Sequence, residues 1–512
     1  MPRRIRNPLY QAMLLCLLSG CTVGPDFEKP AAWFPDEWFS SGTEEPTVAS
    51  VPVSEPLNPD WWALFNDAEL TALEKRVVSA NLDIQAATMR VAESRAQRRI
   101  AGASELPGAN ADASYARELP SAKGAISLIG GGGKGDGGSN AIPLTAFTFP
   151  SFNLWQYGLD SSWELDLWGR VRRSVESADA ALEASAAARR GTLVSVLAEV
   201  ARDYLALRGT QTELKITQEN LALDRDNLRL TRERADAGLA TQLDAANAAA
   251  ALARTGALIP QLEQQQAQYI NQLGFLLGET PGALSAELMT AQAVPPVPPR
   301  VPVGLPSELA RRRPDILQAE AALHAQTAQV GVARANFYPS VNLTGNFDLQ
   351  ALQTKDLGNW AARTYGIGPS LSLPIFQGGE LRGTLKLTKA EAQEAAIAYQ
   401  RTVLNAWQEI ANALIAYEAE QRRGVQLAEA VVQNKRALAL ARQRYKQGLV
   451  DFLQVLATQE NLLTAQQQQA DSVTTLALDL VSLYKALGGG WENTFPVESE
   501  GLHEKGPGDK MP

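Results

Sequence analysis

The residue types most often used for catalysis and metal binding are scarce in this sequence. Its 512 residues include two cysteines, Cys16 and Cys21, and two histidines, His324 and His503. Nothing beyond Cys21 can therefore form an intrachain disulfide or a thiolate metal site. The same counts disfavour a histidine-based triad or a zinc cluster. We expect no catalytic residue, no metal site and no cofactor, so the chain is predicted not to be an enzyme.

Other motifs that resemble ligand sites have structural interpretations. The glycine-rich run 124–140 fails the phosphate-loop pattern, because Leu128 stands at the first required glycine and Gly135 follows the lysine. It is interpreted as a hairpin loop. The run Arg311–Arg313 is interpreted as a solvated turn at the start of a helix, and His324 as a packing or surface residue of a helix. The net charge of −9 argues against a nucleic-acid partner.

The first segment of the chain resembles a bacterial lipoprotein signal. Three arginines precede the apolar stretch Leu9–Leu18, which is too short to span a bilayer. Leu18-Ser19-Gly20-Cys21 then matches a lipobox, so residues 1–20 are predicted to be removed and Cys21 to carry the acyl chains. A simple secretory signal cut nearby is the alternative. Thr22 stands where aspartate often retains lipoproteins in the inner membrane, which favours the outer membrane.

The rest of the chain reads as two copies of one plan. We assign 21–60 to an extended N-terminal segment, 61–280 to the first repeat, 281–306 to a proline-rich linker and 307–491 to the second repeat. The polar tail 492–512 is predicted to be disordered. Landmarks recur in the same order in both copies: Pro107 and Pro339, Tyr157-Gly158 and Tyr365-Gly366, Gly238-Leu239 and Gly448-Leu449, Gly278 and Gly488.

Each copy contains two segments in which apolar and polar residues alternate. Such alternation over about ten residues fits a strand that crosses a bilayer at a tilt. It also fits a soluble sheet with one wet face. Four strands cannot close a barrel alone, because about eight is the practical minimum. The apolar positions are predicted to face lipid: Trp155, Tyr157, Trp163, Leu343, Phe347, Ile367 and Leu371. The acidic residues at the alternate positions are predicted to face a lumen: Asp160, Glu164 and Asp348.

Long helices dominate what remains. Arg170–Ala237 and Glu380–Gln447 contain no proline and repeat small or apolar residues at helical spacing. Each could extend about 100 Å at ~1.5 Å per residue, a length typical of coiled-coil packing. Two shorter helices, Thr241–Gly278 and Ser307–Phe337, are predicted to run end to end beside each long one, with the linker at mid-height.

These features together resemble the TolC-like outer-membrane efflux family, in its OprM/NodT-type lipoprotein branch. The resemblance covers nearly the whole chain, and its specificity comes from the order of the motifs. They stand here as Cys21-Thr22-Val23-Gly24-Pro25-Asp26-Phe27, Trp61-Trp62-Ala63-Leu64-Phe65-Asn66-Asp67, Leu305-Pro306-Ser307-Glu308-Leu309-Ala310-Arg311-Arg312-Arg313-Pro314-Asp315-Ile316, Ala335-Asn336-Phe337-Tyr338-Pro339-Ser340, Pro374-Ile375-Phe376-Gln377-Gly378-Gly379 and Leu483-Tyr484-Lys485-Ala486-Leu487-Gly488-Gly489-Gly490-Trp491.

The resemblance implies a mainly α fold with a β-barrel portion. Three copies would share one 12-stranded transmembrane barrel, four strands per chain, that continues into a long periplasmic α-helical barrel. The implied function is the passive exit duct of a tripartite efflux system for drugs or other small compounds. A periplasmic adaptor and an inner-membrane resistance-nodulation-division pump would be its partners. A periplasmic adaptor-like lipoprotein is the alternative, and a lipoprotein enzyme is a third hypothesis that lacks a catalytic cluster.

The resemblance also assigns residues at the periplasmic end. Both copies break their long helix at a glycine, which relieves the left-handed conformation such turns need. These turns would be the tips that contact the adaptor: Gly238, Leu239, Ala240, Thr241, Gly448, Leu449, Val450 and Asp451.

A closed gate is expected just inside the tips. By its distance from the tip glycine, Asp244 matches a family carboxylate that bonds a tyrosine, here Tyr445. The alternative is that Asp244 stabilises a helix N-terminus. Gln454 and Ala457 stand where many family members carry acidic residues, so Leu453 and Gln454 are assigned to the constriction and a carboxylate ring is not expected.

Overall fold

The computed structural model describes residues 22–30, 50–119, 150–306 and 312–496. The chain divides into two compact units. The first comprises Met1–Phe27, Arg95–Ala180 and His324–Gln393, and the second Glu28–Ser94, Ala181–Leu323 and Glu394–Pro512. Cys21, the glycine-rich run 124–140 and the end of the tail from residue 497 lie outside the described residues.

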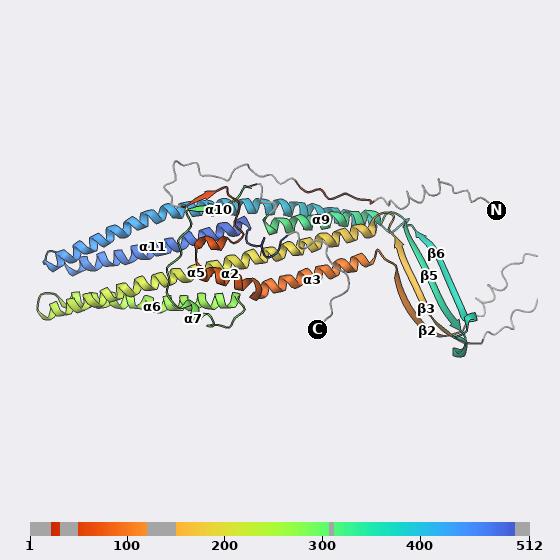
Figure 1. The fold of residues 1–512 in the computed structure, drawn as a ribbon, viewed down its shortest axis with the longest axis horizontal. Helices are drawn as coiled ribbons and strands as arrows, with labels where there is room; N and C mark the ends of the chain where they lie inside the picture. The colour runs from red at the N-terminus through yellow and green to blue at the C-terminus, as the bar shows by residue number, and fades with distance from the viewer. Residues whose placement is uncertain (1–21, 31–49, 120–149, 307–311, 497–512) are drawn as a thin grey trace, which may run out of the picture. The chain divides into compact units, whose positions relative to one another are not determined.

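The first unit contains a four-stranded antiparallel sheet (Figure 1). Its order is β2-β3-β5-β6, so each half of the chain supplies one hairpin and the hairpins meet at β3 and β5. The four alternating segments of the sequence are thereby confirmed as strands. Their bounds are β2 Gly108–Glu118, β3 Phe152–Leu165, β5 Ser340–Ala351 and β6 Arg363–Ser372.

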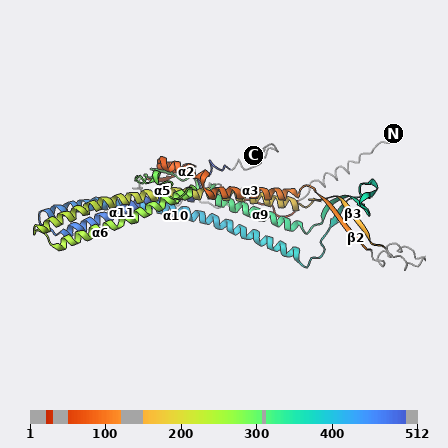
Figure 2. The same ribbon diagram turned by 90° about the horizontal axis from the view of Figure 1, so that it is seen from below.

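Helices account for most of the remaining structure, and the two longest contain 67 residues each. In the second unit, α5, α6, α10 and α11 lie alongside one another (Figures 1 and 2). No described helix combines the length and apolar character needed to cross a membrane. The bounds are α3 Leu82–Ala103, α5 Arg170–Asp236, α6 Gln242–Leu276, α9 Pro314–Ala335, α10 Glu380–Lys446 and α11 Phe452–Leu487.

The main core of the second unit collects around the start of the first repeat. The 3₁₀ turn η1 (Trp61–Phe65) buries Trp61 and Phe65, and Trp61 stacks on Tyr484 of α11 with ring centroids 5.4 Å apart. Helix α2 (Ala68–Ala80) follows. Its N-cap Asp67 accepts hydrogen bonds from the backbone N–H groups of Glu69 and Leu70. This core packs α2 and η1 against α5 and α11.

The proline-rich segment 281–306 has secondary structure of its own. It contains α7 (Ser285–Leu288) and β4 (Arg300–Pro302), and β4 pairs in parallel with β1 (Val51–Val53). Ser50, next to β1, receives a 2.7 Å hydrogen bond from the hydroxyl of Tyr417 and exchanges backbone bonds with the amide of Gln421. The small sheet is thereby attached to α10.

Glu74 of α2 is a buried ionisable residue beside this apolar core. Its side chain is 0% exposed, and neither carboxylate oxygen has a hydrogen-bond partner. Burial raises the pKa of Glu74 well above its ordinary value. The folded chain therefore keeps a proton on Glu74 at pH values at which the unfolded chain has lost it.

Replacing Glu74 by leucine is expected to stabilise the fold. The Glu74→Leu variant removes a buried polar group without a partner, a gain of about 1–3 kcal/mol in the free energy of unfolding at pH 7. Because the folded pKa lies above the unfolded one, the stability contributed through this group falls as pH rises from about 4 towards the raised folded pKa. Urea unfolding at several pH values should show that fall in the native protein and not in the variant. Exposed Glu93→Leu is the control, and identical pH slopes in native protein and Glu74→Leu would contradict the assignment.

Candidate functional site

One face of the sheet is apolar and exposed along its whole width. Residues directly opposite one another share a face, and Leu159 lies opposite Phe347, which lies opposite Tyr365. Large apolar side chains on this face remain open to solvent in the single chain, with Ile367 81% exposed and Leu159 58% exposed. The predicted lipid-facing residues all belong to this face, so the alternation in the sequence is confirmed.

The opposite face is polar and acidic. Asp160 lies opposite Asn110 and Asn346, and Asn110 donates a 3.2 Å hydrogen bond to its carboxylate. Asp348 lies opposite Gly158, where an added Cβ would stand 2.1 Å from a carboxylate oxygen. Glycine at 158 therefore leaves the space that the Asp348 side chain occupies. The predicted lumen-facing residues Asp160, Glu164 and Asp348 share this face.

The two predicted tips have the same backbone geometry. Gly238 and Gly448 adopt φ angles of +70° and +72°, the left-handed region that favours glycine. Gly238 donates to the carbonyl of Ala235 and Leu239 to that of Arg234, at 3.0 and 2.8 Å. The second tip repeats both bonds, from Gly448 and from Leu449. These paired bonds are the Schellman ending of a helix, so each long helix stops for a local reason.

Exposed leucines mark both tips. Leu239 and Leu449, each directly after the tip glycine, are 75% and 68% exposed. Leu243 and Leu453, four residues further on, are 65% and 49% exposed. Sequence reasoning assigned Leu453 to the constriction and left out Leu243, although its spacing from Leu239 equals that between Leu449 and Leu453. Each tip thus presents two leucines to solvent.

The predicted gate residues lie close to the tips, and Asp244 has a different bond from the predicted one. Thr241 and Asp244 form a capping box, in which the Asp244 carboxylate accepts from the Thr241 backbone N–H at 3.0 Å and from its hydroxyl at 2.8 Å. The alternative role, stabilising a helix N-terminus, is what the described geometry shows. Asp451, the N-cap of α11, makes no such side-chain bond.

Tyr445 packs between aromatic and cationic neighbours. Its ring centroid lies 5.6 Å from that of Phe452, and the guanidinium of Arg234 lies 4.7 Å from the ring centroid. Arg234 belongs to α5 and Tyr445 to α10, so this contact joins the hairpin of α5 and α6 to the hairpin of α10 and α11. The predicted bond between Tyr445 and Asp244 stays a prediction.

Sequence reasoning missed a buried polar network farther from the tips. Gln459 of α11 donates a 2.7 Å hydrogen bond to Asp224 of α5 and accepts bonds from Asn227 and Arg442, at 2.5 and 3.3 Å. Thr255 of α6 donates to the second oxygen of Asp224 at 2.7 Å. Asp224 and Gln459 are 5% and 3% exposed. Burial raises the pKa of Asp224, although the bond from Thr255 opposes this effect. The signal in the sequence that could have predicted this network is the presence of polar residues on helix faces that otherwise carry small and apolar residues.

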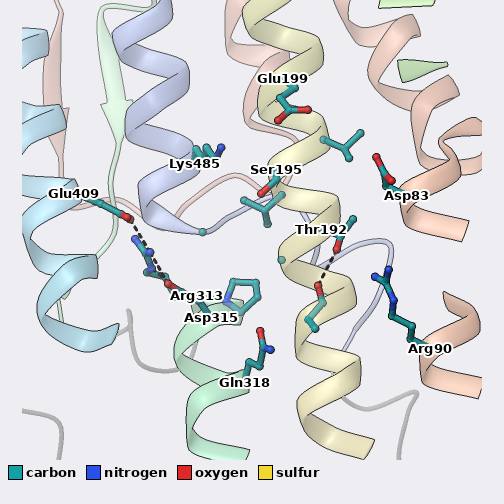
Figure 3. Close-up of a pocket in the computed structure, with 16 residues that line it drawn as sticks. Asp83, Arg90, Thr192, Ser195, Glu199, Arg313, Asp315, Gln318, Glu409 and Lys485 are labelled. Atoms are coloured by element: carbon teal, nitrogen blue, oxygen red, sulfur yellow. Dashed lines mark hydrogen bonds and ion pairs between the residues drawn. The ribbon is translucent and has the colours of Figure 1, made fainter. Parts of the chain in front are cut away.

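A cavity in the second unit lies where five helices meet (Figure 3). Arg313 is only 6% exposed there; it donates to the carbonyl of Ala486 at 2.6 Å and pairs with Glu409 and Asp315. The interpretation of Arg311–Arg313 as a solvated turn is therefore wrong for Arg313. Its charge is buried because two carboxylates and a helix-terminal carbonyl compensate it. The other labelled lining residues are Asp83, Arg90, Thr192, Ser195, Glu199, Gln318 and Lys485.

The described residues directly after Cys21 are held in place. The backbone N–H of Val23 donates to the carbonyl of Trp168 at 3.1 Å, at the passage from β3 to α5. Phe27 stacks on His324 of α9, with ring centroids 4.4 Å apart, and His324 also contacts Glu176 at 3.0 Å. The expectation that His324 packs within the helical structure is thereby confirmed. Within the described ranges, no group of three metal-ligating side chains is placed to hold an ion.

Comparison with known proteins gives one consistent result. The sequence profile described as "Outer membrane efflux protein" matches residues 74–279 and 305–489. The outer membrane protein OprJ of Pseudomonas aeruginosa is 32% identical, and the match covers 95% of this chain and 97% of that protein. The antibiotic efflux pump outer membrane protein ArpC of Pseudomonas putida is 31% identical, with coverage of 95% and 96%.

A solved structure has the same fold. The outer-membrane channel OprN superimposes with a TM-score of 0.81 at 34% sequence identity. The match covers 92% of this chain and 100% of the OprN chain. The fold is therefore shared over almost the full length of both chains.

Proposed function

The chain belongs to the outer membrane efflux protein family and is an outer-membrane efflux channel, and we propose that three copies of it form the exit duct of a tripartite pump. The two-faced sheet carries this proposal. One face is apolar and exposed and the other is polar, as a wall between lipid and water requires. The duct conducts drugs or other small compounds passively.

Open sheet edges support assembly from several copies. Strands β2 and β6 form the two edges of the described sheet, and each has an unpaired row of backbone groups. Four strands are too few to close a barrel. Pairing β2 of one copy with β6 of the next, three times, gives twelve strands and leaves no edge.

Apolar stripes on two helices support the same assembly. Helix α3 leads into edge strand β2, and α10 follows edge strand β6. Both carry apolar residues at every seventh position, the spacing of a coiled-coil seam, and all of these except half-buried Ala411 are exposed. On α10, Ile397 and Leu404 are 66% and 64% exposed, and only Glu418 interrupts the stripe. The stripes comprise Leu82, Met89, Ala96 and Ala103 on α3, and Ala390, Ile397, Leu404, Ala411, Val425, Val432 and Ala439 on α10.

Channel recording tests the function. Purified trimers in planar lipid bilayers should give discrete, reproducible conductance steps, and deletion of the gene should raise the sensitivity of cells to exported compounds. Trimers that insert but conduct no ions would contradict the proposal. The adaptor-like alternative predicts that same silent result.

The lipid anchor is the first finer part of the proposal. The described residues directly after Cys21 contact the passage from β3 to α5 and helix α9, through Val23 and Phe27, which supports an anchor at the residue before them. We expect mass spectrometry of the mature N-terminal peptide to show acyl mass on Cys21. The Cys21→Ala variant should lose it and be processed poorly. An unmodified peptide that begins elsewhere would refute the anchor.

The tips are assigned to a periplasmic adaptor that connects the duct to an inner-membrane resistance-nodulation-division pump. Two exposed leucines on each tip form an apolar patch on the surface. Such exposed patches mark sites of protein–protein contact. Leu239→Asp combined with Leu449→Asp should lower adaptor binding about 100-fold and leave channel conductance unchanged, because apolar contact is lost at both tips. Binding of the reconstituted adaptor to immobilised trimers measures this. The control is Leu352→Asp, an exposed leucine beyond β5. Unaltered adaptor binding would remove the tip assignment.

The proposed constriction of the closed duct lies at the tip end of the helices, next to Gly238 and Gly448. Leu453 and Gln454 are exposed in the single chain, so they are free to line a pore between copies. Asp244 and Tyr445 are proposed to complete the gate through a bond between them. The capping box of Asp244 with Thr241 supports the alternative, in which Asp244 stabilises the N-terminus of α6. A ring of three Leu453 side chains narrows such a pore by size, without a carboxylate ring.

A further inference from the structure

The charged residues of strands β2, β3, β5 and β6 are sorted between the two faces of the sheet. Residues directly opposite one another share a face, so the strand pairs assign each charge to one side. The two basic residues of these strands, Arg117 and Arg363, both lie on the apolar face. All five carboxylates lie on the polar face: Asp112, Glu118, Asp160, Glu164 and Asp348.

Both arginines stand at the same end of the sheet, next to aromatic side chains. Arg117 is the last residue but one of β2 and Arg363 the first of β6, so both lie at the end opposite to the helices. Tyr115 and Trp155, on the same face as Arg117, have ring centroids 4.4 Å apart. The guanidinium of Arg363 lies 4.7 Å from the ring centroid of Trp360. Aromatic side chains at the end of an apolar band are typical of a membrane interface.

The two guanidinium groups have donors left to bind an anion. Arg117 donates to the hydroxyl of Ser151 at 3.2 Å, and Arg363 donates to the carbonyl of Trp360 at 2.7 Å. In the described part of the chain no carboxylate is among their partners, and both side chains are exposed. A guanidinium carries five N–H donors in a planar fork that matches the oxygen atoms of a phosphate group.

The proposed assembly brings the two arginines to one seam. Strands β2 and β6 are the edges of the sheet. Strand β2 runs away from the helices and β6 runs back towards them, so antiparallel pairing of β2 in one copy with β6 in the next keeps their outer ends together. Arg117 of one copy and Arg363 of the next then lie at the same end of the seam, on its lipid-facing side.

We propose that Arg117 of one copy and Arg363 of the next bind the phosphorylated headgroup of lipid A, the membrane anchor of lipopolysaccharide in the outer leaflet. The inference rests on the proposed function, because it needs the outer end of the sheet at the outer leaflet and a seam between β2 and β6. Lipid A has two phosphate groups and several acyl chains. Its phosphates bind the arginines, and its chains cover the exposed apolar face, which includes Leu159 and Ile367. A free phosphate ion would leave that face uncovered, and this favours the lipid.

Native mass spectrometry of delipidated full-length trimers, titrated with lipid A, tests the site. The native protein should bind one lipid A molecule per chain with high affinity. Arg117→Gln and Arg363→Gln should each lower the affinity roughly tenfold at every site, in keeping with loss of a charge-assisted hydrogen bond. Arg225→Gln is the matched control, because it removes an exposed arginine of α5, outside the sheet, and should bind lipid A like the native protein.

Other ligands separate the headgroup from its competitors. Lipid A without its phosphate groups should bind the native trimer roughly tenfold more weakly, since the arginines then lack an anionic partner. Phosphatidylglycerol, which has one phosphate group, should also bind more weakly than lipid A. Excess inorganic phosphate should not displace lipid A, because the ion makes no contact with the apolar face.

Several results would overturn the lipid A site. Native-like affinity in both glutamine variants would do so, as would equal affinity of the native trimer for lipid A with and without phosphate, a comparison that needs no variant. Single variants that keep the native affinity at half the number of sites would refute a site shared between copies. Equal affinity for phosphatidylglycerol, or displacement by inorganic phosphate, would refute recognition of lipid A. A native chain that forms no trimer would instead refute the proposed function.

Discussion

Arginine in place of Leu159 is expected to remove the protein from the outer membrane. Leu159 lies near the middle of β3, on the apolar face, and is 58% exposed in the single chain. Arginine at the midplane of a lipid-facing strand costs about 2–4 kcal/mol. In the proposed trimer this cost applies three times per assembly. Trimer yield in outer-membrane fractions and refolding into lipid vesicles measure the effect.

The control for this prediction lies on the same strand. Gln156→Arg places the same side chain on the polar face, where Gln156 lies opposite Ser114 and Gln350. This variant should insert normally, since a water-filled lumen solvates the charge. Leu159→Ala distinguishes loss of apolar area from the cost of charge. Equal insertion of Leu159→Arg and Gln156→Arg would mean that the two faces do not separate lipid from water.

Glutamate at two positions of the α10 stripe is expected to prevent trimer assembly. Ile397 and Leu404 lie one heptad apart and are exposed in the single chain. If α3 of a second copy covers them, each substitution buries a charge without a partner, which costs several kcal/mol. The Ile397→Glu, Leu404→Glu variant should sediment as a monomer while its helical circular dichroism stays near the native value.

Gln408→Glu is the matched control for the stripe. It lies about one turn from Leu404 on α10, is exposed, and already carries a polar side chain outside the apolar stripe. It should trimerise normally. Normal trimers from the double variant would show that the stripe faces water in the assembly, and the seam between α3 and α10 would have to be abandoned.

Local periodicity explains how much of this fold is predictable from the sequence. Alternation identified all four strands, because side chains on a strand point to opposite faces in turn and need no distant partner to do so. The ends of α5 and α10 were identified at Gly238 and Gly448, because a left-handed residue is a local requirement. The order of the family motifs indicated an outer-membrane efflux protein, and the profile match and the OprN structure support this class.

Other features depend on residues far apart in the chain, and only the tertiary structure decided them. The carboxylate of Asp224 meets Gln459 across more than 200 positions, and no local pattern distinguishes that aspartate from exposed Asp226. Arg313 appears solvated in the sequence and is buried in the structure, because Ala486 and Glu409 reach it from α11 and α10. Periodicity thus determined which elements form and which faces they present, while pairing between distant polar groups needed the packed helices to bring them together.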